Sequence, residues 1–162
     1  MNRWLQTAPL ATIAHGQVGV MLSIADQADR PPRPLQDGDI LELGGKRVRY
    51  FATPHVPHGW DAGALFEETT KTLFAGDLFT RLGDDAVTTS GDILEPALTT
   101  EDRFLSTSLT PLTAPTIRRF AALDATTLAL MHAPAFTGDT RTALNELAGA
   151  YASRLEAQLA TL

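Results

Sequence analysis

The sequence predicts a mixed α/β (α+β) domain in which a sheet built from hairpins is flanked by helices. Two observations predict the sheet: Gly44-Gly45 separates two strand-like runs, and a second pair of such runs lies within residues 63–75. A two-residue glycine connection between strand-like runs is a strong hairpin signal. A third observation predicts a packed helix, because leucines and Tyr151 recur at three- and four-residue steps near the end of the chain.

The composition is that of an ordinary globular protein, with 44% apolar and 20% charged residues. At 162 residues the chain is long enough for a sizeable core, so residues 1–162 are expected to form a single domain. A net charge of -6 with scattered basic residues argues against nucleic acid as a partner, and no apolar run is long enough for a membrane span. The chain has no cysteine, which excludes disulfides and thiolate chemistry and fits a cytoplasmic location.

In the first half of the chain, residues 3–8 are typical of the end of a helix that Pro9 stops. Residues 17–28 are expected to form a short helix, and the proline-rich residues 30–34 an extended connector. Four strands then form a meander with one buried face, and they are expected at residues 39–43, 46–52, 63–67 and 72–75.

In the second half, residues 80–99 are polar and irregular, with turns at Gly83-Asp84-Asp85 and Gly91-Asp92, and form either a functional or a flexible loop. A helix at 101–109, with Phe104 and Leu105 inward, and a helix with Thr113 as its N-cap are expected next. A strand at 126–131 and a helix opened by Gly138-Asp139 follow. The apolar stripe of that last helix comprises Leu144, Leu147, Tyr151, Leu155, Leu159 and Leu162.

Side chains with metal-ligand chemistry lie at strand ends. His55 and His58 occupy a Pro- and Gly-rich turn, Asp77 follows the strand at 72–75, and His132 closes the strand at 126–131. A carboxylate between core-like residues is costly unless it is hydrogen-bonded or bound to a cation. Imidazole and carboxylate donors together suit a divalent transition metal such as zinc or iron.

The residues alone leave structural alternatives open. Asp77 would also serve as a turn cap at the end of its strand, and histidines such as His55 and His58 occur more often as surface or satisfied core residues than as ligands. His15, in an apolar run before Gly16, is interpreted as such an ordinary histidine.

Three segments carry a family resemblance: TPHVPHGWDAG, LFAGDLF and LALMHAPAF, in this order along the chain. In order and spacing the chain resembles the C-terminal part of a metallo-β-lactamase-fold protein, in the branch with flavodiiron proteins, oxygen-binding diiron proteins and related hydrolases. The resemblance implies the second half of an αββα sandwich and a zinc or iron site, dinuclear in the intact family. It implies that His58 binds one ion, that His132 binds the other, and that Asp77 bridges both.

Two further residues are assigned to the surroundings of that site. His55 is expected to lie beside the ligands without binding metal itself. Asp61, three residues after His58, is expected either to orient the His58 imidazole from outside the ligand set or to cap a turn.

The chain also departs from the family. The first ligand cluster of the family, His-x-(His/Glu)-x-Asp-His, is absent, and no His-x-x-x-Asp-His string occurs in the 162 residues. We therefore expect a truncated domain with weak metal binding and low or no activity, no assignable catalytic residue and an unidentified small-molecule substrate. Because half a domain exposes apolar surface, a homodimer or docking to a missing N-terminal half is also expected.

Three functional hypotheses follow. The first is a metal-dependent hydrolase or diiron oxidoreductase of which this chain is the second half. The second is a non-catalytic remnant that serves as an interaction or dimerisation module. The third is a metal-free α/β module in which His58, Asp77 and His132 are structural.

Overall fold

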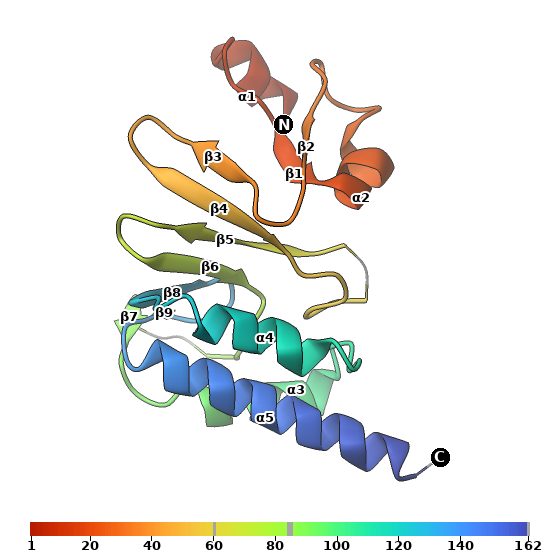
Figure 1. Ribbon diagram of the computed structural model, residues 1–162, viewed down its shortest axis with the longest axis vertical. Coiled ribbons are helices and arrows are strands. Elements are labelled where there is room, and N and C mark those ends of the chain that lie inside the picture. The colour runs from red at the N-terminus through yellow and green to blue at the C-terminus, as the bar shows by residue number, and fades with distance from the viewer. Residues whose placement is uncertain (60, 84–85, 162) are drawn as a thin grey trace.

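The computed structural model describes residues 1–59, 61–83 and 86–161. In these residues the strands form a two-stranded and a seven-stranded sheet (Figure 1). Asp84, Asp85 and Leu162, which the sequence analysis placed in a turn and in the last helix, lie outside the described residues. Within the described ranges, no helix has the length and apolar character needed to cross a membrane.

The chain begins with a small unit that stands at one end of the molecule (Figure 1). It comprises helix α1 (Asn2–Thr7), strand β1 (Ala14–Gly16), helix α2 (Gln17–Gly19), its continuation as the π-helix η1 (Val20–Ile24), and strand β2 (Arg33–Leu35). β1 and β2 pair in parallel. The expected helical segments are thus confirmed, and the proline-rich connector is extended as predicted and ends in a strand.

The main sheet has the order β3-β4-β5-β6-β8-β9-β7. Its strands are β3 (Ile40–Glu42), β4 (Arg47–Ala52), β5 (Gly63–Glu67), β6 (Thr72–Gly76), β7 (Thr88–Thr89), β8 (Thr127–Leu130) and β9 (Ala135–Phe136). β3 to β6 form the predicted antiparallel meander. Gly44 and Gly45 have φ values of 60° and 94°, and this positive pair is what a two-residue hairpin turn requires.

β8 joins the sheet beside β6 and runs parallel to it. A parallel neighbour needs a long crossover, and here the crossover contains α3 (Leu94–Phe104) and α4 (Thr113–Ala121). As a result, Gly76 at the end of β6 lies opposite Leu130 at the end of β8. This pairing places the residues that follow the two strands at the same edge of the sheet.

One face of the sheet forms the main core with α4 and α5 (Thr140–Leu159), which lie side by side across it (Figure 1). Phe66 and Leu73 are register partners on this face, and both are buried. Leu144 of α5 and Ile117 of α4 are completely buried in the same cluster. This layer of helices on one sheet face is the rigid base from which the strand ends project.

The opposite face of the sheet is only partly covered. Tyr50 on this face is buried, and a Cβ added at Gly16 of the N-terminal unit would lie 2.5 Å from its hydroxyl. Further along the same face, Phe74 pairs with Leu65 and Ala129 but is 48% exposed. The N-terminal unit therefore covers one end of this face and leaves the phenylalanine open.

The helix predicted at 101–109 is in fact α3, Leu94–Phe104. It begins earlier because the Asp92 carboxylate accepts hydrogen bonds from the N–H groups of Leu94 and Glu95. It ends at Leu105, which has a φ of 50° and closes the helix in the left-handed conformation. Phe104 and Leu105, expected to point inward, are exposed, because the buried side of α3 is formed by Ala97, Thr100 and Glu101.

The caps of α5 and α4 and the buried stripe of α5 agree only in part with the prediction. The Asp139 side chain accepts the N–H of Thr142 at 3.0 Å and caps α5, as the Gly138-Asp139 pair predicts. The apolar stripe of α5 is buried only as far as Tyr151, and Leu159 near its end is exposed. Thr113 is the first residue of α4 rather than its N-cap, which is Leu112.

Candidate metal centre

His58 lies in the loop between β4 and β5. The backbone N–H of Thr53 donates to the carbonyl of Ala62, which closes the base of this loop, and the buried Thr53 hydroxyl donates to the carbonyl of Val56. The loop also accepts a hydrogen bond at the Pro57 carbonyl from the N–H of Ser108, at 2.7 Å. These bonds hold the His58 backbone against the segment that follows α3.

Asp77 directly follows β6, where Gly76 has a positive φ of 58° and turns the chain out of the sheet. The Asp77 carbonyl accepts hydrogen bonds from the N–H and the hydroxyl of Thr80. The next two side chains, Leu78 and Phe79, are buried in the core. The Asp77 backbone is therefore firmly held, while its side chain remains 26% exposed at the sheet edge.

His132 follows β8, and its position results from the parallel pairing with β6. The N–H of Met131 donates to the carbonyl of Gly76, and the N–H of Arg81 donates to the carbonyl of His132. Because the ends of neighbouring parallel strands meet at one edge, residues far apart in sequence come together there. His132 accordingly faces Asp77 across this edge.

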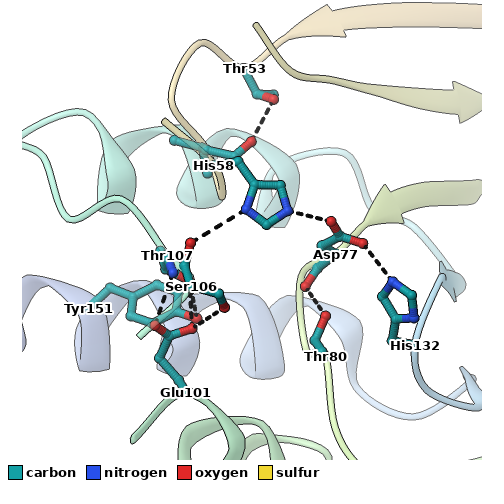
Figure 2. A network of polar contacts seen from close by, with 10 residues as sticks. Thr53, His58, Asp77, Thr80, Glu101, Ser106, Thr107, His132 and Tyr151 are labelled. Carbon is teal, nitrogen blue, oxygen red and sulfur yellow. Dashed lines mark hydrogen bonds and ion pairs between the residues drawn. The ribbon is translucent and has the colours of Figure 1, made fainter. Parts of the chain in front are cut away.

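The three residues that the sequence analysis named as ligands converge on a single carboxylate (Figure 2). The Nε2 atom of His58 lies 2.5 Å from Oδ2 of Asp77. The Nε2 atom of His132 lies 3.3 Å from Oδ1 of Asp77, without the alignment of a hydrogen bond. Oδ1 is buried and has no hydrogen-bond partner among the described residues.

These donors fit a cation chemically, although they do not yet surround one. In the described part of the chain, no group of three or more His, Cys, Asp or Glu side chains is arranged to hold a metal ion as it stands. Bond lengths of ~2.1 Å and tetrahedral angles place neighbouring zinc ligands about 3.4 Å apart. The separation of 3.3 Å between His132 and Asp77 matches that value, whereas 2.5 Å between His58 and Asp77 is a hydrogen-bond distance.

The buried Oδ1 of Asp77, which has no hydrogen-bond partner among the described residues, is the observation that favours a bound cation. An acceptor that is removed from water without a partner costs about 1–3 kcal/mol, and a cation bound there would remove that cost. Imidazole nitrogens and a carboxylate are also the donor types that zinc and iron accept. The residues present therefore suit a divalent transition metal, as part of a ligand set.

The two residues expected around the ligands are His55 and Asp61. His55 is exposed and has a positive φ of 63° in the loop before His58. The Asp61 carboxylate accepts the N–H of Gly19 at 2.7 Å and lies 4.0 Å from Nδ1 of His15. Asp61 thus ties its loop to the N-terminal unit.

A buried polar cluster below His58 was missed by the sequence analysis, which placed Glu101 in the first turn of a helix. Glu101 accepts hydrogen bonds from Ser106 and Thr107, and the Thr107 hydroxyl lies 3.2 Å from that of Tyr151 (Figure 2). Burial raises the pKa of Tyr151, so its hydroxyl stays protonated. The available signal was the polar run 106–108 after the helix, whose donors need an acceptor such as a carboxylate one turn earlier.

No protein-family model matches this chain, and no curated protein sequence matches it significantly. Solved structures do match it.

The apo state of the chemotaxis sensor ODP from T. denticola has a TM-score of 0.70 and 19% identity, with 86% of this chain and 59% of that chain covered. A flavodiiron core from Synechocystis sp. PCC6803, from a metal-soaked crystal, has a TM-score of 0.67 and 24% identity over 94% of this chain and 38% of that chain. A metallo-beta-lactamase family protein from Thermus thermophilus has a TM-score of 0.53 and 29% identity over 83% of this chain and 40% of that chain.

This chain spans 38–59% of the length of these three structures. The α/β architecture with a mixed sheet and flanking helices is the one they share. The expectation of a metallo-β-lactamase-type fold is therefore confirmed.

Proposed function

We propose that this chain contributes half of a metal centre in a metallo-β-lactamase-fold protein, and that His58, Asp77 and His132 are its ligands. One observation carries the proposal: the Asp77 carboxylate lies between two imidazoles, with Oδ2 facing His58 and Oδ1 facing His132. A carboxylate with one oxygen towards each imidazole is suited to bridge two ions. Its unpartnered buried oxygen provides the electrostatic reason for a cation to bind.

The chemistry we favour is that of a diiron oxygen-binding protein, with metal-dependent hydrolysis as the second candidate. A flavodiiron core among the similar structures supports the first, and a metallo-beta-lactamase family protein supports the second. A bound divalent metal would supply Lewis acidity and lower the pKa of a coordinated water. The chain's own part is to hold the two imidazoles on a rigid sheet edge and to neutralise part of the metal charge with Asp77.

With the ligands proposed here, this chain alone would not complete a metal site. If Asp77 bridges two ions, each ion receives one imidazole and one carboxylate oxygen from this chain, fewer than the three protein ligands of a catalytic zinc. The sequence lacks the His-x-x-x-Asp-His string that would add donors. We therefore propose that the remaining ligands come from another polypeptide segment, and that the chain alone binds metal weakly and has low or no activity.

Metal titration tests this proposal. Calorimetry with Zn²⁺, and with Fe²⁺ under anaerobic conditions, is expected to show weak binding that His58→Ala and His132→Ala each abolish. His55→Asn is the matched control, since it removes an exposed imidazole from the same loop and asparagine accepts the positive φ of 63°. Binding that is unchanged in both alanine variants, or tight binding with all ligands supplied by this chain, would contradict the proposal.

A second candidate function is an interaction module, which the uncovered sheet face favours. Phe74 is 48% exposed on that face, and its register partners Leu65 and Ala129 are only partly buried. Large exposed apolar side chains mark association surfaces when they form a contiguous patch. We propose that this face pairs with a second copy of the chain or with the segment that supplies the missing ligands.

Light scattering coupled to size-exclusion chromatography separates these outcomes. A homodimer that Phe74→Ser dissociates supports association through the open face. A wild-type chain that stays monomeric at high concentration and remains soluble contradicts homodimerisation through it.

A further inference from the structure

Glu101 carries a buried carboxylate that has no role in the proposed function. Glu101 lies in the last turn of α3 and is only 8% exposed. It accepts hydrogen bonds from the Ser106 hydroxyl at 3.1 Å, the Thr107 N–H at 3.0 Å and the Thr107 hydroxyl at 2.8 Å. A buried carboxylate with three donors is a strong anchor, because removing any donor leaves charge unsatisfied in a dry site.

The anchored segment is the one that contacts His58. Leu105, with a φ of 50°, turns the chain back after α3. The carbonyl of Ser106 then lies 3.4 Å from Nδ1 of His58 (Figure 2). The N–H of Ser108 donates to the carbonyl of Pro57 in the same loop as His58. Glu101 thus holds the segment whose backbone contacts the His58 ring and its loop.

The Ser106 carbonyl and the Asp77 carboxylate lie at the two ring nitrogens of His58, at 3.4 Å from Nδ1 and 2.5 Å from Nε2. Both oxygens accept hydrogen bonds, so together they fix which way the ring is turned and keep Nε2 towards Asp77. Partners of this kind fix the ring orientation of metal-ligating histidines.

We propose that Glu101 is a positioning residue for His58: its buried carboxylate holds the 105–108 segment so that the Ser106 carbonyl faces Nδ1, orients the imidazole ring and keeps Nε2 towards the site. As far as it concerns a metal ion, this inference rests on the proposed function. The ring-orienting part does not, because it concerns the metal-free protein.

The test compares two buried glutamates that each accept hydrogen bonds from residues following them in the sequence. Glu67 is also 8% exposed and accepts hydrogen bonds from the N–H groups of Thr69 and Thr70 and from the Thr70 hydroxyl. It lies at the β5–β6 turn, at the opposite end of β6 from Asp77. Glu67→Gln therefore imposes the same chemical change as Glu101→Gln without touching the segment that contacts His58.

The readout is the ring-nitrogen NMR spectrum of His58 in metal-free protein at one fixed pH, assigned by its loss in His58→Ala. In Glu101→Gln we expect the Nδ1 signal of His58 to shift, because its carbonyl partner is no longer held in place, and in Glu67→Gln we expect no shift. If Glu101→Gln fails to fold, Thr107→Val removes one donor from the same carboxylate and is expected to shift the signal in the same direction. An unshifted His58 signal in the folded variant, or an equal shift in Glu67→Gln, overturns the inference.

Zn²⁺ titration of the same variants gives the second readout. Loss of an outer partner of a ligating histidine weakens metal binding by roughly 10- to 100-fold, and we expect this for Glu101→Gln but not for Glu67→Gln. If the wild-type chain binds no Zn²⁺ while the NMR shift is seen, the proposed function fails and the positioning role stands. If Zn²⁺ binds and the His58 signal does not respond to Glu101→Gln, the positioning role fails and the proposed function stands.

Discussion

The substitution Asp77→Asn is expected to leave the stability of the metal-free protein nearly unchanged and to remove most of its stabilisation by metal. The asparagine side chain would keep the shape of the aspartate but lose the charge and one acceptor oxygen. A charge-assisted hydrogen bond such as the one to His58 contributes about 1.5–3 kcal/mol when buried, and less here because the Asp77 side chain is 26% exposed. Against this loss, the asparagine N–H₂ group in the place of Oδ1 would face Nε2 of His132 as a donor, so the variant no longer buries an acceptor that lacks a partner, a cost of about 1–3 kcal/mol.

The two effects on Asp77→Asn nearly cancel, so we expect its free energy of unfolding without metal to lie within about 1 kcal/mol of the wild type. Added Zn²⁺ is expected to stabilise the wild type more than the variant. Zn²⁺ at about ten times its Kd stabilises the folded state by about 1.4 kcal/mol. For a chain of 162 residues, each kcal/mol raises the Tm by about 2–4 °C, so the wild type is expected to gain about 3–6 °C.

Thermal unfolding followed by circular dichroism, with and without Zn²⁺, measures both effects. Asp77→Asn is expected to keep its metal-free Tm but to gain less than about 1 °C from Zn²⁺, since Asp77 supplies an oxygen to each proposed ion. His55→Asn serves as the control that keeps the full gain. An Asp77→Asn variant with the full Zn²⁺ response would refute the assignment of this carboxylate as a ligand, and a large loss of metal-free stability would refute the cancellation.

Three further predictions concern Glu67, helix α5 and the metal content of the purified chain. Hydrogen bonds, first that from the Thr70 hydroxyl, lower the pKa of Glu67 from 4.5 to about 2, so its stabilising contribution is complete above pH 4.5 and is lost as the pH falls towards 2. Glu67→Gln should flatten the dependence of the Tm on pH in that window, and a parallel curve would contradict this. Leu144→Ala should cost about 2–5 kcal/mol in chemical unfolding because Leu144 is completely buried, whereas Leu159→Ala on the exposed end of the same helix should change stability by less than about 0.5 kcal/mol. Elemental analysis of the purified chain should find less than one metal ion per molecule, and a stoichiometric, tightly held ion would show that the site is complete without further ligands.

Strands β3–β6 and helix α3 differ in how well the sequence predicts their bounds. The hairpins follow from local turn chemistry, since Gly44 and Gly45 adopt the positive φ values that the turn requires. The helix predicted at 101–109 with Phe104 and Leu105 inward instead begins at Leu94 and leaves both residues exposed. Burial of an apolar side chain depends on what packs against it, and in the structure Thr100 and Glu101 occupy the buried side of that helix.

The sequence by itself determined the local elements: the hairpins and the Asp139 cap of α5 depend on residue type and short-range spacing. It also supplied the candidate donors, and the family resemblance of three segments singled out His58, Asp77 and His132 among them. Only the tertiary structure decided which of these residues meet. The parallel pairing of β6 with β8 brings His132 to Asp77 from far along the sequence, and the fold of its loop brings Asp61 to Gly19. The buried Glu101 beneath His58 likewise depends on long-range packing, because a carboxylate's partners are set by the segments that surround it and not by its place in the chain.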